Sequence, residues 1–168
     1  MKRLYILVVL LISSVSVLIA EADNYFFCNV GPDRPIHQET WGIHAGIGGF
    51  GLLENVLLFG GFGEYFGTDN ERMHLGNGGA ILGIGHIFGR RLVLSVEGIA
   101  GLGGGIINQE AGVVYVYGVN AIIGHRFARG VYLGIGAGYR SICRFVGFSN
   151  SDDTYDYLSI NFWSIFGP

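Results

Sequence analysis

The chain has 168 residues, which is enough for about one domain, and half of them are hydrophobic while only 14% are charged. Its 30 glycines follow no collagen-like period, and its aromatic content of 14% is too high for a disordered linker. The formal net charge is −3 and there is no basic tract, so the composition argues against nucleic acid as a partner.

The first 22 residues have the features of a secretory signal peptide. Lys2 and Arg3 precede an apolar run from Leu4 to Ile19, and the small residues of Ala20-Glu21-Ala22 provide a cleavage site before Asp23. The alternative, an uncleaved membrane anchor, is disfavoured because the run is short for a span and a cleavage pattern follows it. We therefore expect an exported mature domain over residues 23–168, with eight arginines against twelve acids.

The apolar residues of the mature chain alternate with a period of two, which is typical of strands and not of helices. Between Leu92 and Leu102, for example, one face is wholly apolar, while the other carries Ser95 and Glu97. The same test along the chain predicts eight strands, near residues 24–30, 39–49, 54–66, 76–88, 91–103, 113–127, 130–146 and 154–166.

The predicted connections are of two kinds that alternate along the chain. Short ones lie near residues 50–54, 89–91 and 128–130, and longer polar ones begin at Gly31, Gly67, Gly103 and Gly147. Because the number of strands is even, both termini should fall at the end of the short turns.

These faces predict an all-β fold, an eight-stranded antiparallel up-and-down transmembrane β-barrel over residues 23–168. Lipid satisfies no backbone polar group, so a sheet can cross a membrane only when it is closed, with its apolar face outward. An eight-stranded barrel is just wide enough for side chains to fill it, and inward glycines would make room for Phe62, Tyr132 and Trp163.

The chain resembles the small bacterial outer-membrane barrels of the OmpA/OmpX type. Its last segment, YLSINFWSIF, resembles the assembly signal of that family, with an apolar face formed by Leu158, Ile160, Phe162 and Phe166. Ser164 and the terminal Gly167-Pro168 depart from the pattern. The resemblance implies a location in the bacterial outer membrane, contact with its lipid, and the barrel-assembly machinery as a partner during biogenesis.

The pattern Gly-His-x-Phe-x-Arg occurs twice, from Gly85 and from Gly124, each time at a short turn. We interpret these residues as interfacial anchors, because aromatic rings favour the headgroup level and arginines bind lipid phosphates. The anchors are His86, Phe88, Arg90, His125, Phe127 and Arg129. A metal site would need converging ligands, and the pattern offers none, so we expect no metal and no other cofactor.

The inward register collects polar residues that we expect to form a structural network filling the lumen. An unpaired buried charge is costly, so Glu64 and Glu97 should pair with Arg140 and Arg144. The predicted network comprises His44, Glu64, Glu97, Asn120, Arg140 and Arg144. The sequence therefore favours a structural or surface-interaction role without catalytic activity.

Three alternatives stay open at this stage. A lipid-modifying hydrolase could use His37, His44 or His74 as its base, but no serine lies in a matching register and no GxSxG motif is present. A soluble exported barrel binding an apolar ligand would need its apolar face inside. A glycine-rich helical membrane protein would place Glu54 and Glu97 inside its spans, which is expensive.

Two features concern the surface and the thiols. The longer loops are polar and acidic, which suits an extracellular partner; their acids are Asp69, Glu71, Glu110, Asp152 and Asp153. Cys28 and Cys143 would be separated by the last strand, too far for a disulfide at ~4.8 Å per strand spacing, so we expect free thiols.

Overall fold

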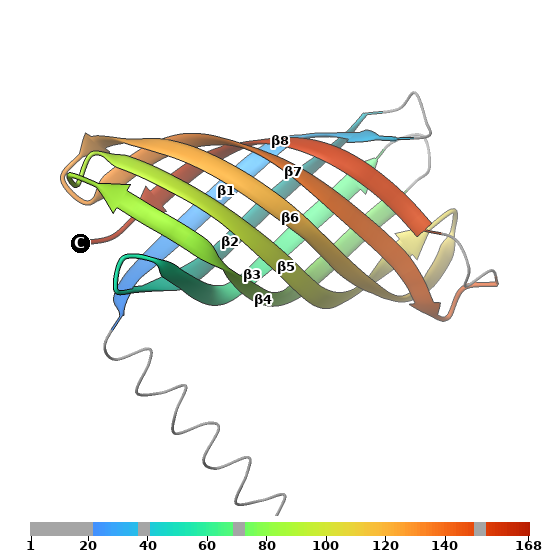
Figure 1. The fold of residues 1–168 in the computed structure, drawn as a ribbon. Coiled ribbons are helices and arrows are strands. Elements are labelled where there is room, and N and C mark those ends of the chain that lie inside the picture. The colour runs from blue at the N-terminus through green and yellow to red at the C-terminus, as the bar shows by residue number, and fades with distance from the viewer. Residues whose placement is uncertain (1–21, 37–40, 69–72, 150–153) are drawn as a thin grey trace, which may run out of the picture.

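The computed structural model describes residues 22–36, 41–68, 73–149 and 154–168 (Figure 1). The predicted signal peptide, apart from Ala22, lies outside the described residues. The strands are β1 (Asp23–Pro35), β2 (Gly42–Leu53), β3 (Leu57–Thr68), β4 (Met73–Phe88), β5 (Leu92–Ile107), β6 (Glu110–Ala128), β7 (Val131–Val146) and β8 (Thr154–Phe166).

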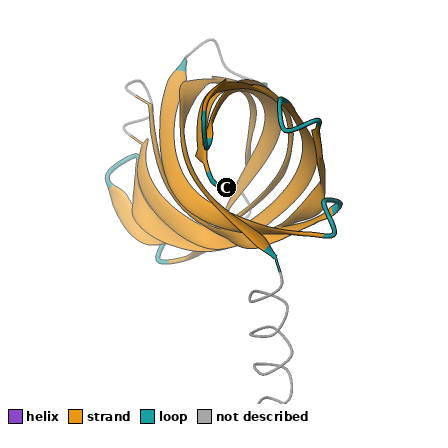
Figure 2. Cartoon of the chain, turned by 90° about the vertical axis from the view of Figure 1, so that its left-hand side faces the viewer, coloured by secondary structure: helices purple, strands orange, loops and turns teal. Residues whose placement is uncertain are grey.

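Each strand pairs antiparallel with its neighbour in the chain, and β8 returns to pair with β1, which closes the sheet into a barrel. The closed ring is visible along the barrel axis in Figure 2. The expected all-β, eight-stranded, up-and-down fold is confirmed, and the helical alternative is wrong. No helix that is long and apolar enough to cross a membrane occurs in the described part of the chain.

The two faces of the strands lie as the alternation predicts. On β5, Leu94, Val96 and Leu102 are exposed on the outside, while Val93 and Glu97 are buried inside. The same division holds on β8, where the predicted assembly-signal residues are all exposed; these are Leu158, Ile160, Phe162 and Phe166. The barrel therefore carries its apolar face outward, which is the reverse of a barrel that folds around an apolar ligand.

The turn between β2 and β3 lies later in the chain than expected. β2 continues through the predicted turn to Leu53, and Phe50 and Leu52 are buried inside the barrel as part of its alternation. The turn itself is made by Glu54 and Asn55, whose φ angles are 52° and 57°. Gly49 and Gly51, on either side of Phe50, are strand residues.

The connections at the opposite end are shorter than predicted, because the strands extend into them. β1 runs on to Pro35, and β5 and β6 are joined by only Asn108 and Gln109, where a long loop was expected. The φ angles of these two residues are 51° and 72°, which is the backbone of a type I′ hairpin turn. The strand ends at this end of the barrel are rich in glycine and polar residues, a composition typical of loops, so the sequence predicted loops that are too long.

Replacing Gln109 with glycine is expected to stabilise the protein. Gln109 holds a positive φ of 72°, which costs a residue with a Cβ about 1 kcal/mol and costs glycine nothing, so the gain should be of that order. Urea-induced unfolding in lipid vesicles measures the effect. Gln109→Ala keeps the strain and serves as the control, and a glycine variant no more stable than the alanine variant would contradict the assignment of the turn.

The interior of the barrel has two apolar clusters at different depths. Near the short turns, Tyr25 stacks on Phe50 with ring centroids 5.2 Å apart, and Phe27 packs against Trp163 at 4.8 Å. Towards the other end, a second cluster contains Met73, Leu75, Ile107, and the ring pair Phe66–Tyr157 at 4.6 Å. The inward faces were expected to be mixed in character, but this layering by depth was not foreseen.

Candidate functional site: the polar belt of the lumen

A set of buried polar side chains faces the barrel interior, on strands that also supply the two apolar clusters. We call this set the polar belt. Its members are Asn29, Asp33, His44, Glu64, Glu97, Asn120, Arg140, Ser159 and Asn161, each less than 9% exposed. The strands alternate, so each of these residues lies on the inward register, and the barrel buries charge in its interior.

Arg140 on β7 is the hub of the belt. Its Nη2 lies 3.1 Å from Oε2 of Glu64 and its Nε 3.5 Å from Oε1, so the guanidinium meets the carboxylate with two nitrogens. Its Nη1 donates to Oδ1 of Asn120 at 2.7 Å, and the Asn120 amide donates to Glu97 at 2.8 Å. One arginine thus joins two carboxylates on β3 and β5, one directly and one through an amide.

His44 belongs to a different part of the belt, with a partner that the sequence did not reveal. Its Nδ1 lies 2.7 Å from Oδ2 of Asp33, and both side chains are almost completely buried. Asp33 was assigned to a loop, although Asn29, Gly31 and Asp33 continue the inward register of β1. That register, extended beyond Val30, is the signal that could have found it.

Arg144 lies further along β7, at the end of the barrel opposite the β6–β7 turn. Its guanidinium donates a hydrogen bond to the hydroxyl of Tyr155 and stands 5.2 Å from the ring of Tyr155 and 5.3 Å from that of Phe148. The structure therefore brings Glu64, Glu97, Asn120 and Arg140 into one network, while Arg144 binds aromatic rings at the rim.

The space left inside the belt is small. A cavity of about 10 Å³ lies among Asn29, Glu64, Glu97 and Arg140, bordered by Phe27 and Trp163. This volume is of the order needed by a single water molecule. In the described part of the barrel, the belt can hold charges and a water, but it has no room for an apolar ligand.

The described residues give little support for catalysis at the candidate histidines. His44 has a carboxylate partner, but its Nε2 has no hydrogen-bond partner among the described residues. His74 pairs with the hydroxyl of Tyr65 on the outer surface at 2.7 Å, and His37 lies outside the described residues. Among the residues that the structure describes, no three potential metal ligands converge.

Both copies of the repeated pattern lie at short turns, in the outward register. Phe88 and Phe127 are exposed, and Arg90 and Arg129 lie in or beside the turns. His86 packs on Phe88 with ring centroids 4.3 Å apart, and its Nδ1 lies 2.9 Å from the carbonyl oxygen of Asn55. His125 is exposed, so the two histidines share a register but have different surroundings.

Asn55 is a site residue that the sequence did not reveal. Its side-chain oxygen accepts a hydrogen bond from the amide of Ile87 at 3.0 Å, and the carbonyl of Val56 accepts one from the amide of Gly85. The pairing of β3 with β4 stops at Leu57 and Ile84, but β4 continues to Phe88. Asn55 supplies the hydrogen-bond acceptor that a further β3 residue would otherwise provide to β4. Asparagine is also one of the residues that tolerate a positive φ, which this turn requires.

Both cysteines are free thiols. Cys143 is buried on the outward register of β7, where the hydroxyl of Thr154 lies 3.8 Å from its sulfur. β8 lies between the strands of Cys143 and Cys28.

Fold and interior together define a class of structure: a closed, eight-stranded antiparallel barrel with apolar side chains outside and a charged, side-chain-filled interior. A solved structure with a similar fold is the crystal structure of Neisserial surface protein A. The two match with a TM-score of 0.67 over 86% of this chain and 97% of the other, at 10% sequence identity. At that identity, the likeness establishes the fold.

Comparison with protein-family models found no match, and comparison with curated protein sequences found none either.

Proposed function

We propose that this protein is an integral β-barrel of the bacterial outer membrane, with a sealed lumen and a structural or surface-interaction role. The observation that carries the proposal is the outer surface. Large apolar side chains are exposed around the barrel, among them Leu82 (65%), Ile84 (62%) and Leu102 (63%). Soluble monomers rarely expose such continuous apolar surface, whereas a closed barrel in lipid requires it.

The interior supports a sealed lumen. Apolar clusters lie on both sides of the polar belt, and the internal cavity is about 10 Å³. Each charge in the Arg140 network has a partner of opposite sign or an amide, which is the condition for keeping charge in a buried site. We expect a barrel of this kind to pass neither large solutes nor a measurable ion current.

The β2–β3, β4–β5 and β6–β7 turns, the start of β1 at Asp23 and the C-terminus lie at one end of the barrel, at the left of Figure 1. In outer-membrane barrels the short turns face the periplasm, so the opposite end would face the exterior. The predicted leader would deliver the chain, and the barrel-assembly machinery would recognise the apolar face of β8 that ends in Phe166. The fold likeness to Neisserial surface protein A agrees with an envelope location.

The exterior end offers the surface for an extracellular partner. Trp41 and Phe145 are exposed there, at 60% each. Beside the Asn108–Gln109 turn, beyond the apolar band, Ser149 donates its amide and hydroxyl to Glu110, and these hydrogen bonds hold the pKa of that carboxyl below its usual range. Glu110 is thus an ionised group that holds Ser149, shortly after β7, against the β5–β6 hairpin.

A lipid-modifying hydrolase is supported by the Asp33–His44 pair alone. That pair resembles the base and orienting acid of a triad, but it is sealed inside the barrel, and among the described residues no serine hydroxyl contacts His44. A membrane lipid cannot reach it. The structural role is therefore the better supported of the two.

The proposal is tested by refolding the chain from Asp23 in detergent and reconstituting it. Unheated samples should migrate differently from boiled samples on SDS gels, because a closed barrel resists SDS until it is heated. In planar lipid bilayers, the same preparation should give no resolvable single-channel current. The boiled preparation serves as the unfolded control for both measurements.

Two results would contradict the proposal. Solubility without detergent, with no difference between boiled and unboiled samples, would contradict the membrane location. Discrete current steps from a preparation that shows the mobility difference would be consistent with a barrel but would contradict the sealed lumen.

A further inference from the structure

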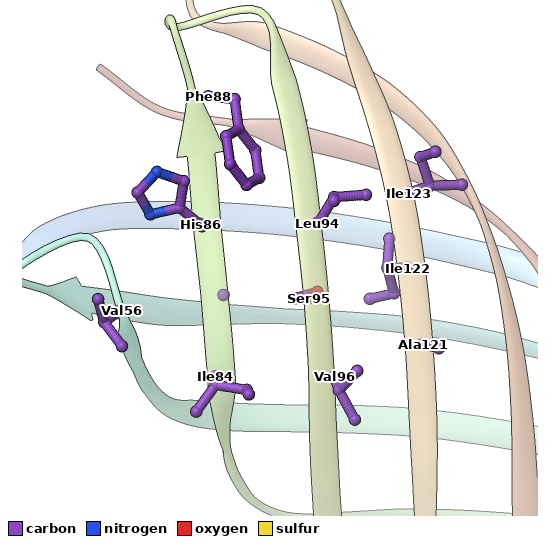
Figure 3. A pocket seen from close by; sticks show the side chains of 11 residues that line it. Val56, Ile84, His86, Phe88, Leu94, Ser95, Val96, Ala121, Ile122 and Ile123 are labelled. Carbon is purple, nitrogen blue, oxygen red and sulfur yellow. The ribbon is translucent and has the colours of Figure 1, made fainter.

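The outer surface of the barrel has an apolar hollow near the short turns, with a volume of about 530 Å³. Figure 3 shows its walls: Phe88 and Ile84 from β4, Leu94 from β5 and Ile123 from β6, with Val56 at one side. We call it the β4–β6 hollow. Its volume lies within the range of roughly 300–1,000 Å³ that is usual for small-molecule sites.

The hollow exists because a small residue lies between large ones. Ala121 on β6 carries only a methyl group, while its neighbours on the outward register, Val96 and Ile123, are branched; Gly85 on β4 belongs to the inward register and contributes only backbone to the wall. His86 at the edge is held by Asn55, and the amide of Gly85 donates to the carbonyl of Val56 at 2.8 Å. The wall on the Val56 side is therefore fixed by hydrogen bonds and does not depend on a ligand.

Arginines gather at the end of the strands that form this hollow. Arg90 and Arg91 make the β4–β5 turn, two and three residues beyond Phe88, and Arg126 and Arg129 lie at the end of β6. The amide of Arg126 donates to the carbonyl of Arg91 at 2.7 Å, so the two groups are adjacent. The acid nearest in the chain to a lining residue is Glu97, which follows Val96, but its side chain is buried inside the barrel; Glu54 lies two residues before Val56.

A second hollow on the barrel provides a comparison. It has a volume of about 690 Å³, lies against β1 to β4, and is lined by Phe59, Ala80 and Leu82. The charged residues at the short-turn ends of β1 and β2 are acids, Asp23 before Asn24 and Glu54 after Leu53, and β4, which borders both hollows, ends at the Arg90 turn. Both hollows are apolar, but arginines end β6 as well as β4 beside the β4–β6 hollow, whereas acids end β1 and β2 beside the second.

We propose that the β4–β6 hollow binds one phospholipid, with an acyl chain along Ile84, Val96 and Ile123 and the phosphate at Arg90. An apolar trough that ends in arginines matches a molecule with an apolar chain and an anionic head, since a guanidinium forms charge-assisted hydrogen bonds with phosphate. The inference rests on the proposed membrane location, in which this end of the barrel lies in the periplasmic leaflet.

The test is native mass spectrometry of the full barrel, released in mild detergent from vesicles of phosphatidylethanolamine and phosphatidylglycerol. The unmodified protein should retain one phospholipid. Ala121→Leu fills the hollow and should reduce retention about tenfold, which corresponds to about 1.4 kcal/mol. Arg90→Ala removes a phosphate partner and should reduce retention about fivefold. Ala80→Leu fills the second hollow in the same way and should leave retention unchanged.

The gel-mobility difference is measured on every variant, so that a lipid result is read only from folded barrels. Equal phospholipid retention in Ala121→Leu and the unmodified protein would overturn the inference. A loss of retention in Ala80→Leu as large as that in Ala121→Leu would also overturn it, because it would indicate unspecific lipid on the barrel surface. Retention of added lipopolysaccharide in preference to phospholipid would also overturn it. Absence of the mobility difference in the unmodified protein would instead overturn the proposed function on which the inference rests.

Discussion

Replacing Arg140 with methionine should lower the free energy of unfolding by about 3–5 kcal/mol, the cost of removing one partner from a buried ion pair. The side chain of Arg140 is 7% exposed and that of Glu64 is 5% exposed. Without the guanidinium, the Glu64 carboxylate would lose two donors, and Asn120 would lose the donor to its oxygen. The cavity beside them, of about 10 Å³, has room for one water molecule, which is too few to replace three donors.

The measurement is urea-induced unfolding in lipid vesicles, followed by tryptophan fluorescence. The chain has two tryptophans, and Trp163 lies inside the barrel next to the belt, so its emission reports the loss of the interior. Arg129→Met is the matched control: it removes the same group from an exposed position at a turn, and it should change stability by less than about 0.5 kcal/mol.

A double variant separates the burial of charge from a simple loss of packing. Glu64→Leu with Arg140→Met removes both charges, and a buried pair replaced by apolar groups is often as stable as the original. The double variant should therefore recover most of the stability that Arg140→Met loses. Two results would contradict a buried ion pair between Glu64 and Arg140. One is a loss of unfolding free energy in Arg140→Met as small as that in Arg129→Met. The other is a double variant that is less stable than either single variant.

The faces of the strands could be predicted from the sequence, because burial in a barrel follows the two-residue period of the backbone. Leu92 to Leu102 shows this most plainly: every second residue is apolar and faces outward, so the inward position of Glu97 follows directly. Part of the Arg140 network could be predicted for the same reason, since inward polar residues in a narrow interior bind one another: Glu64, Glu97, Asn120 and Arg140 do so. His44 and Arg144, which were predicted in the same network, instead bind Asp33 and aromatic residues at the rim.

The pairing within the network could not be predicted, because it depends on the relative height of distant strands. Arg140 and Glu64 are 76 residues apart, and their heights are set by the register of every hairpin between them. The pairing of Asp33 with His44 was missed for a related reason. The composition after Val30 is typical of a loop, so the sequence did not show that β1 continues to Pro35. A displaced turn, such as Glu54–Asn55, changes strand lengths without changing which face a residue takes.

The seam where β1 meets β8 carries the second large effect, at Gly31. Gly31 is buried in the inward register, and β8 passes so close to it that a methyl group at Gly31 would overlap the carbonyl oxygen of Ile160. This atom belongs to the backbone and cannot rotate away, so β1 and β8 would have to separate. No bridge pairs are formed at Gly31 and Pro32, although the register is the same on both sides of them.

Gly31→Ala is therefore expected to lower the free energy of unfolding by about 3 kcal/mol, the upper part of the range for an overpacked site, and to weaken closure of the barrel in particular. The readout is the temperature at which the unheated gel band converts to the boiled one, alongside urea unfolding in vesicles. Gly76→Ala is the control, because a methyl group there meets nothing within 4 Å. Equal conversion temperatures for the two variants would show that the seam has room for a side chain, and that barrel closure does not depend on the glycine. A fall confined to Gly31→Ala would identify the β1–β8 contact as the step on which the sealed structure depends, since this pairing joins the first and the last of the described strands and thereby closes the barrel.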